Sequence, residues 1–254
     1  MASEARPAIV PFKCTECGKC CKEFYHNQSY GHFFVLDNGL PLNLAEKEIF
    51  EREAKRQGKQ VDIRWGRVVW DELSGQAIGV SWCSASEPCL FLREDNRCAN
   101  YAHRPVYCRA FPVRPAFVEP DTGLVKFAGT SCPDDFFPAS FPEHRERRVS
   151  NRELAQAYHR YYADDYAWAR VKEELEKRLV QFVDELIGEG IIKPLAVSQE
   201  GETRVRGKPV MSLDEFLEGK GFQRKALLEK LFSIDFPAVK ERVLAEVRAG
   251  EALP

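Results

Sequence analysis

The distribution of cysteine constrains this chain more than any other feature of its sequence. All nine cysteines of the 254-residue chain lie between residues 14 and 132, and the first four follow the pattern C-x2-C-x2-CC. Nine is high for a protein of a reducing compartment and low for a disulfide scaffold of this length. Burial alone gives no reason for such spacing. The pattern therefore indicates metal ligation by thiolates.

Eight of the cysteines fall into two sets that we predict to be metal ligands. They are Cys14, Cys17, Cys20 and Cys21 in the first set, and Cys89, Cys98, Cys108 and Cys132 in the second. Gaps of two residues let neighbouring thiolates face the same side of a tight turn. The adjacent pair Cys20 and Cys21 diverges in most backbone conformations and does not suit one tetrahedral ion. Eight ligands make either two four-ligand sites or one four-cysteine cluster with spare thiols.

The ligand type and spacing favour iron–sulfur chemistry over zinc. Soft thiolates select zinc or iron–sulfur clusters rather than calcium or magnesium. The first set opens like a bacterial ferredoxin run, although the proline-terminated fourth cysteine of that run is absent. The gaps in the second set are wider than those of a standard zinc ribbon. We expect a 4Fe-4S cluster with a structural or redox role, and a structural zinc ion is the alternative.

Residues beside the cysteines are candidates for secondary roles. Thiolate-bound metals carry excess negative charge, which nearby cations or amide donors must offset. We predict that Arg104 and Arg109 contact the surroundings of the cofactor, either as donors to sulfur or carbonyl oxygen or as a pair that binds an anion. Arg104 precedes a proline and is expected to be extended. Cys83 lies outside both sets and is interpreted as a small core or surface thiol, with a spare ligand or redox partner as the alternative.

The first half of the chain mixes a helix with short strands. Asn43 is a suitable N-cap for a helix over residues 44–57, which has acidic residues early and basic residues late. Residues 61–82 read as strands broken at Gly66 and at Ser74-Gly75, which indicates a small antiparallel sheet. Residues 124–132 predict one more strand.

The second half is predicted to be mainly helical. Apolar residues from Leu154 to Leu186 recur at steps of three, four or seven and predict one long helix that ends at Gly188 or Gly190. Ser212 is expected to cap another helix, and two further helices are expected at 226–232 and 237–249. The apolar stripe of the long helix needs a surface to cover.

These elements predict an α+β fold with two regions. A cysteine-rich, loop-rich metal-binding half with a small antiparallel sheet occupies residues 1–148. A mainly helical region occupies residues 149–254 and packs on it. The change from proline-rich to charged helical sequence places this boundary.

Charge and hydropathy exclude several classes of function. Lys and Arg number 37 against 39 Asp and Glu, so the net charge is −2 and no nucleic-acid partner is expected. No segment is apolar over the length that a membrane span requires. The first residues lack the apolar core of an export signal, and we expect a cytoplasmic protein.

The cysteine motifs resemble a known family. The segments CTECGKCC at residues 14–21 and EPCLFLREDNRCANYAHRPVYCRAFP at residues 87–112 are similar to the signature of the CxxCxxCC family, and Cys132 fits a later family cysteine. The resemblance covers about residues 12–133 and implies zinc or iron binding. Asn100 departs from the pattern, since the family commonly has an aliphatic residue there.

A third hypothesis follows from the same resemblance. Flagellin lysine N-methylases contain a similar cysteine cluster, so the resemblance also implies a protein-modifying enzyme that uses the metal centre on a protein substrate or partner. The chain has no glycine-rich loop for S-adenosylmethionine after a strand. This hypothesis therefore depends on analogy alone.

Overall fold

The computed structural model describes residues 29–110 and 163–249, together with Gly18, residues 21–22 and three short strands at 116–118, 125–127 and 148–149. The chain forms two compact units. The described residues of unit 2 lie within Cys21–Tyr107 and Glu174–Ser233, and those of unit 1 lie mainly within Cys108–Glu173 and Ile234–Pro254. Each unit therefore contains segments from both halves of the sequence.

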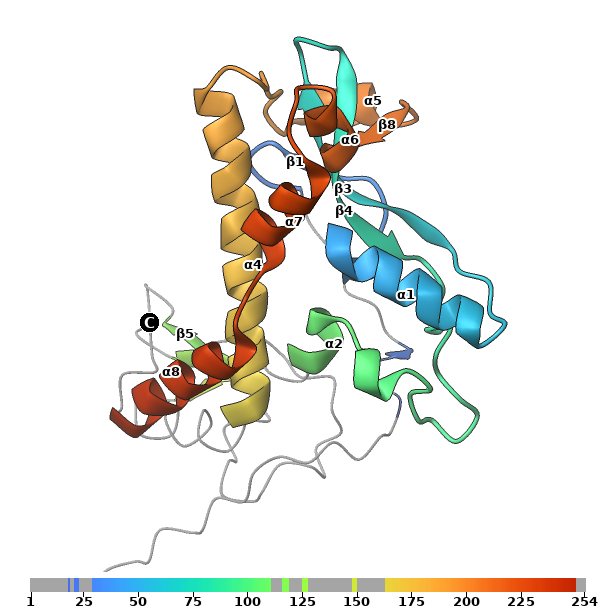
Figure 1. The fold of residues 1–254 in the computed structure, drawn as a ribbon, viewed down its shortest axis with the longest axis vertical. Helices are drawn as coiled ribbons and strands as arrows, with labels where there is room; N and C mark the ends of the chain where they lie inside the picture. The colour runs from blue at the N-terminus through green and yellow to red at the C-terminus, as the bar shows by residue number, and fades with distance from the viewer. Residues whose placement is uncertain are drawn as a thin grey trace, which may run out of the picture. The chain divides into compact units, whose positions relative to one another are not determined.

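A five-stranded sheet forms the centre of unit 2 (Figure 1). Its strands are β1 (Phe33–Val35), β2 (Leu40–Leu42), β3 (Ile63–Asp71), β4 (Gln76–Ser84) and β8 (Val210–Ser212). The order β1-β3-β4-β2 is antiparallel throughout, and β8 pairs with β4 in parallel. The predicted hairpin is present, with Gly75 in its turn at φ +69°. This conformation is left-handed and favours glycine.

The predicted break at Gly66 is wrong, because β3 continues through this residue. The pairing of β3 with β4 shifts register between Trp65 and Arg67, so the glycine marks a bulge within one strand. The ring of Trp65 stacks on Trp82 of β4 with centroids 3.4 Å apart. The same ring covers Gly79, where an added Cβ atom would lie 2.1 Å from it.

Helix α1 (Leu44–Arg56) lies alongside the β3–β4 hairpin (Figure 1). The Asn43 side chain accepts hydrogen bonds from the backbone N–H groups of Ala45 and Glu46, at 3.0 and 2.9 Å. The Glu46 carboxylate in turn accepts the N–H of Asn43 at 3.1 Å. This reciprocal cap satisfies donors that the first turn would otherwise leave unpaired. The predicted helix and its cap are confirmed.

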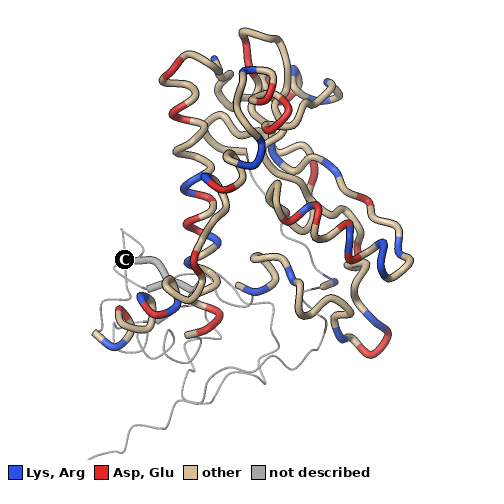
Figure 2. Tube along the Cα trace, viewed as in Figure 1, with Lys and Arg blue, Asp and Glu red and all other residues tan. Residues whose placement is uncertain are grey.

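The predicted helices of the second half are also present. They are α4 (Ala163–Gly188), α6 (Leu213–Glu218), α7 (Arg224–Phe232) and α8 (Phe236–Ala249), with α5 (Gln199–Val205) in addition. Helix α4 ends at Gly188 as predicted, and Ser212 caps α6 together with Glu215. The expected start of the long helix, from Leu154 to Tyr161, lies outside the described residues. Figure 2 shows basic and acidic residues interspersed along α4, where Arg178 pairs with Glu174 at 3.0 Å.

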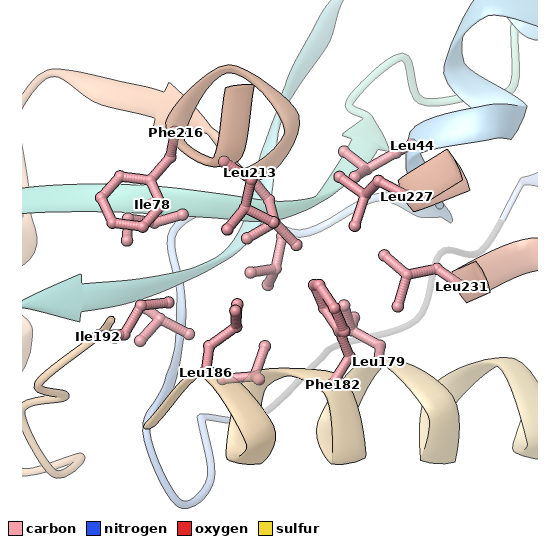
Figure 3. Close-up of a cluster of buried hydrophobic side chains, with 14 of the residues drawn as sticks. Leu44, Ile78, Leu179, Phe182, Leu186, Ile192, Leu213, Phe216, Leu227 and Leu231 are labelled. Atoms are coloured by element: carbon pink, nitrogen blue, oxygen red, sulfur yellow. The ribbon is translucent and has the colours of Figure 1, made fainter. Parts of the chain in front are cut away.

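The apolar stripe of α4 covers the sheet of unit 2. Figure 3 shows Leu179, Phe182 and Leu186 of α4 facing Ile78 of β4 and Leu213 of α6. All five side chains are at most 6% exposed. Leu44 of α1 and residues of α7 complete the same cluster. The helical half of the sequence therefore supplies the apolar cover of this sheet.

Unit 1 combines helices with a second small sheet. Strands β5 (Ala116–Val118), β6 (Val125–Phe127) and β7 (Arg148–Val149) form an antiparallel sheet in the order β5-β6-β7. Strand β6 falls within the strand predicted at 124–132. The residues of α4 up to Glu173 belong to this unit, where Trp168 stacks on Phe236 of α8 with ring centroids 3.7 Å apart.

The α+β fold class is confirmed. The parallel strand β8 was not predicted, because three residues carry too little pattern to identify a strand. The two compact units do not divide at residue 148, and the boundary between residues 148 and 149 stays a prediction about separable domains. No helix of the described residues is long and apolar enough to cross a membrane.

Candidate metal centre

The structure brings together three of the predicted cysteine ligands in unit 2. The backbone N–H of Cys89 donates to the carbonyl oxygen of Cys21 at 2.8 Å. Cys21 and Cys98 each add to the rise in the pKa of the Cys89 thiol that burial produces, because neighbouring thiolates would repel one another. Cys108 is described within unit 1, and the other four predicted ligands, Cys14, Cys17, Cys20 and Cys132, lie outside the described residues.

A tight loop places Cys98 next to Cys89. Leu92 and Cys98 form an antiparallel bridge, and the N–H of Arg93 donates to the carbonyl oxygen of Arg97 at 2.9 Å. Asn96 closes the turn at φ +61°, a left-handed conformation that asparagine tolerates better than most residues. The nine-position gap between the cysteines is therefore spanned by a hairpin-like turn.

The cysteine loop is anchored on helix α1. Phe91 is 2% exposed and meets Phe50 of α1 edge-on, with ring centroids 4.9 Å apart. The carbonyl oxygen of Phe91 accepts the N–H of Ala99 at 2.8 Å. Lys59, which follows α1, donates to the carbonyl oxygen of Leu90 at 2.5 Å. These contacts fix the loop from its apolar side and leave the cysteines at its ends.

Backbone amides are directed at two of the sulfur atoms. The N–H of Phe91 donates to the sulfur of Cys89, and the N–H of Asn100 donates to the sulfur of Cys98. Each donor follows its cysteine by two residues. Amide donors of this kind stabilise a thiolate over a thiol. This arrangement suits sulfur atoms that carry negative charge.

Burial dominates the acidity of these thiols. It raises the pKa of Cys89 to about 11, against the lowering effect of the Phe91 amide. Burial also raises the pKa of Cys98, and here the Asn100 amide, Arg104 and Lys59 act in the opposite direction. The thiolate forms of such buried groups require a compensating positive charge. A metal ion supplies that charge, and its binding releases the thiol protons.

Cys83 has different surroundings. It lies on β4 and is fully buried, and burial raises its pKa to about 12. Arg64 and Pro41 are its partners on the neighbouring strands. Cys83 is thus a buried thiol of the sheet, as interpreted from the sequence.

The two predicted cofactor-contacting arginines each stack on an aromatic ring. Arg104 is extended at φ −61° and ψ 138°, and its guanidinium lies 3.7 Å from the centre of the Tyr101 ring. It also lowers the pKa of the Cys98 thiol, so its charge reaches the sulfur. Arg109 belongs to unit 1, where its guanidinium lies 4.7 Å from the centre of the Trp168 ring. Their contact with a cofactor stays a prediction.

Asn100 gains a role from the structure. Its side chain is buried and donates to the carbonyl oxygen of His103 at 3.2 Å, across the short 3-10 helix Tyr101–His103. An aliphatic residue would lack this hydrogen bond. Its departure from the family pattern thus adds a contact that holds the turn after Cys98.

A polar network near Cys108 was missed by the sequence analysis. Arg67 of β3 donates to both carboxylate oxygens of Glu176 on α4, at 2.7 and 2.9 Å, and to the hydroxyl of Tyr30 at 3.0 Å. The hydroxyl of Tyr107 donates to the same carboxylate. Burial on its own would lower the pKa of Arg67, but Glu176 raises it above its ordinary value. The signal was an arginine inside an apolar strand, since a buried charge needs a partner.

The described thiols fit a soft metal by their chemistry. Cys89 and Cys98 are sulfur donors that accept backbone amide hydrogen bonds, and Lys59 and Arg104 add positive charge near Cys98. Within residues 29–110 and 163–249 and the shorter described pieces, no group of three or more His, Cys, Asp or Glu side chains is arranged to hold a metal ion. The assignment of Cys21, Cys89 and Cys98 as metal ligands therefore stays a prediction.

These features are those of a cysteine-cluster domain of the metal-binding class. Residues 13–133 match the CxxCxxCC family, which is described as "Putative zinc- or iron-chelating domain". The resemblance seen in the sequence is therefore confirmed over these residues, which make up just under half of the chain. The match supports metal binding without choosing between zinc and iron. No curated protein and no solved structure matches the chain.

Proposed function

We propose that the chain holds an iron–sulfur cluster of the 4Fe-4S type. Its ligands are drawn from the eight cysteines of the two sets. The observation that supports the proposal is that the main chains at Cys21 and Cys89 are hydrogen-bonded to each other, while Cys89 and Cys98 each accept a backbone amide hydrogen bond at sulfur.

The choice of iron over zinc rests on the ligand spacing. The first set resembles the start of a ferredoxin run, and the second set lacks the paired short gaps of zinc ribbons. Every donor in both sets is a thiolate, which is the usual ligand of iron–sulfur clusters. Zinc in a structural site is the competing assignment.

The surroundings of the cysteines support a structural or redox role. Phe91 and Phe50 exclude water from one side of the loop. Lys59 and Arg104 contribute positive charge at Cys98. Hydrogen bonds to sulfur, burial and local charge are the factors by which a protein sets the potential of a cluster. Arg104 would thus tune the centre through Cys98.

Anaerobic purification with elemental analysis tests the proposal. Iron, zinc and labile sulfide are measured per chain, and the visible absorption spectrum is recorded before and after reduction. About four iron and about four sulfide per chain, with broad visible absorption that bleaches on reduction, support a 4Fe-4S cluster. Zinc without iron or sulfide overturns it in favour of the zinc assignment. A chain with neither metal after anaerobic loading overturns metal binding altogether.

A further inference from the structure

Helix α4 contacts both sequence neighbours of Cys108. This cysteine lies in the short helix α2 (Val106–Ala110), between Tyr107 and Arg109. Tyr107 donates its hydroxyl hydrogen bond to Glu176, and Arg109 stacks on Trp168. Both partners belong to α4, which lies outside the family match at residues 13–133. The first contact lies within unit 2 and the second within unit 1.

The contact on the Tyr107 side is held by buried charges. The Glu176 carboxylate accepts hydrogen bonds from the Tyr107 hydroxyl and from two N–H groups of Arg67. The Arg67 side chain is 9% exposed, so this carboxylate is its principal counter-charge and cannot move away without leaving a buried cation. Arg67 of the sheet thus fixes the position of the Glu176 carboxylate, and this carboxylate fixes the position of the Tyr107 hydroxyl.

The contact on the Arg109 side is held by stacked rings. The Arg109 guanidinium lies over the Trp168 ring, and Trp168 itself stacks on Phe236 of α8 with an interplanar angle of 15°. A planar guanidinium on an indole face is a favourable cation–π arrangement. Trp168 is thereby held by α8 as well as by its own helix.

Helix α2 depends on such contacts for its position. It has five residues, too few to be stable as an isolated helix. At its first residue, the N–H of Val106 donates to the carboxylate of Glu46 at 2.6 Å. Within unit 2, α2 is therefore fixed at its start by Glu46 of α1 and at Tyr107, the residue before Cys108, by Glu176 of α4.

We propose that Tyr107 and Glu176 are positioning residues that hold Cys108 in place as a metal ligand, so that α4 is part of the metal centre's support. This inference rests on the proposed function, since it requires a metal at the cysteines. Residues that orient ligands without touching the metal commonly change metal affinity about 10- to 100-fold when they are replaced.

The test uses full-length variants with matched controls. Tyr107→Phe removes only the hydroxyl that reaches Glu176, and Glu176→Gln removes the charge. Tyr30→Phe is the control for the first, because it removes another hydroxyl from the same network away from the cysteines. Glu185→Gln is the control for the second, because Glu185 lies on the same helix as Glu176 and its carboxylate pairs with Lys230 of α7 at 2.8 Å.

Two measurements separate positioning from general destabilisation. The first is the loss of bound metal to an excess of chelator, and the second is the visible charge-transfer spectrum of the loaded protein. We expect Tyr107→Phe and Glu176→Gln to lose metal about 10-fold more readily than the wild type and to change the spectrum. The control variants should match the wild type in both. If Glu176→Gln does not fold, the comparison of Tyr107→Phe with Tyr30→Phe decides.

The outcomes distinguish this inference from the proposed function. A wild-type chain that takes up no metal overturns the proposed function and this inference with it. A loaded wild type with Tyr107→Phe indistinguishable from Tyr30→Phe overturns the inference alone. Equal loss of metal from Tyr107→Phe and Tyr30→Phe also overturns the inference alone, because the effect would then belong to the whole Arg67–Glu176 network.

Discussion

The backbone N–H of Cys89 donates to the carbonyl oxygen of Cys21, at 2.8 Å. This hydrogen bond joins the end of the first cysteine set to the start of the second. It places the main chain at Cys21 beside the main chain at Cys89, and the loop from Cys89 leads to a third thiol, that of Cys98. Loss of one of these three thiols should therefore differ in effect from loss of the Cys83 thiol, which lies in the sheet.

The first prediction compares Cys98→Ala with Cys83→Ala. Cys98→Ala should lower the bound metal per chain and the midpoint of thermal unfolding, because metal-binding free energy is also folding free energy. Cys83→Ala should keep the wild-type metal content and lose about 1 kcal/mol of stability, through a small cavity in the sheet. Elemental analysis and calorimetry on both variants check this. Equal metal content in the two variants would remove Cys98 from the ligand set.

The remaining predicted ligands are tested in the same way. Cys14→Ser, Cys20→Ser and Cys108→Ser should each lose metal and unfold at a lower temperature, because each removes one thiolate donor. The measurement is metal content per chain beside the thermal midpoint. Unchanged metal content in all three would contradict the assignment of the two cysteine sets.

The second prediction concerns Arg104. Burial raises the pKa of the Cys98 thiol and the positive charge of Arg104, which stacks on Tyr101, partly opposes this, so Arg104→Gln should weaken the hold on the metal by about 10-fold. Arg93→Gln is the control, since Arg93 lies in the same loop but pairs with the exposed Asp95. Competition with a chelator at neutral pH measures the difference. Equal retention in the two variants would assign Arg104 a role in packing alone.

The third prediction is a pH dependence of stability at Asp71. Burial on its own would raise the pKa of Asp71, but hydrogen bonds from Ser74, Lys193 and Leu73 outweigh it and the pKa lies below its ordinary value of 3.8. A depressed pKa stabilises the folded chain above pH 3.8, and this stabilisation is lost as the pH falls through the lower folded value.

Asp71→Asn should therefore lose about 1–3 kcal/mol at neutral pH, and its difference from the wild type should narrow below pH 3.8. Asp37→Asn is the control, because the side chain of Asp37 is 40% exposed. Denaturant unfolding at a series of pH values gives both curves. A constant difference across the acidic range would show that the Asp71 contacts do not depend on its charge.

The fourth prediction concerns the apolar cover supplied by α4. Leu186 is 2% exposed in the cluster that covers the sheet, so Leu186→Ala should cost about 3 kcal/mol of unfolding free energy. Leu73 at the hairpin turn is 62% exposed, and Leu73→Ala should change stability by less than about 0.5 kcal/mol. Chemical denaturation compares the two. Similar losses would mean that the α4 stripe adds little to the core.

The fifth prediction follows from the same cover. A chain that ends at residue 150 lacks α4, α6 and α7, and it exposes Phe33, Val69 and Ile78, which these helices bury. We expect this fragment to be insoluble, because a large exposed apolar surface promotes aggregation. Expression followed by size-exclusion chromatography tests it. A soluble fragment that retains metal would instead support separable domains divided near residue 148.

Local signals in the sequence predicted most of the helices. Asn43 and Ser212 both form the expected caps, because a cap depends on residues within one turn. The end of α4 at Gly188 and the hairpin turn at Gly75 follow equally local chemistry. Gly66 misled the prediction, since a glycine can produce a bulge as readily as a break.

Contacts between distant residues were harder to predict. The parallel pairing of β8 with β4 and the Arg67–Glu176 pair join segments whose separation in sequence gives no periodic signal. The spacing of cysteines identified the candidate ligands, but not that Phe91 and Asn100 would direct their amides at sulfur. Those donors are backbone N–H groups, which every residue except proline has, so the amino-acid sequence does not reveal them.

The ring of Trp65 lying over Gly79 limits how this sheet can change during evolution. An alanine at position 79 would place its methyl carbon 2.1 Å from that indole, which no small adjustment of a β-strand accommodates. Position 79 is thus closed to larger residues while the tryptophan is kept. Homologous chains should vary the two positions jointly, and a side chain at 79 should accompany a smaller residue at 65.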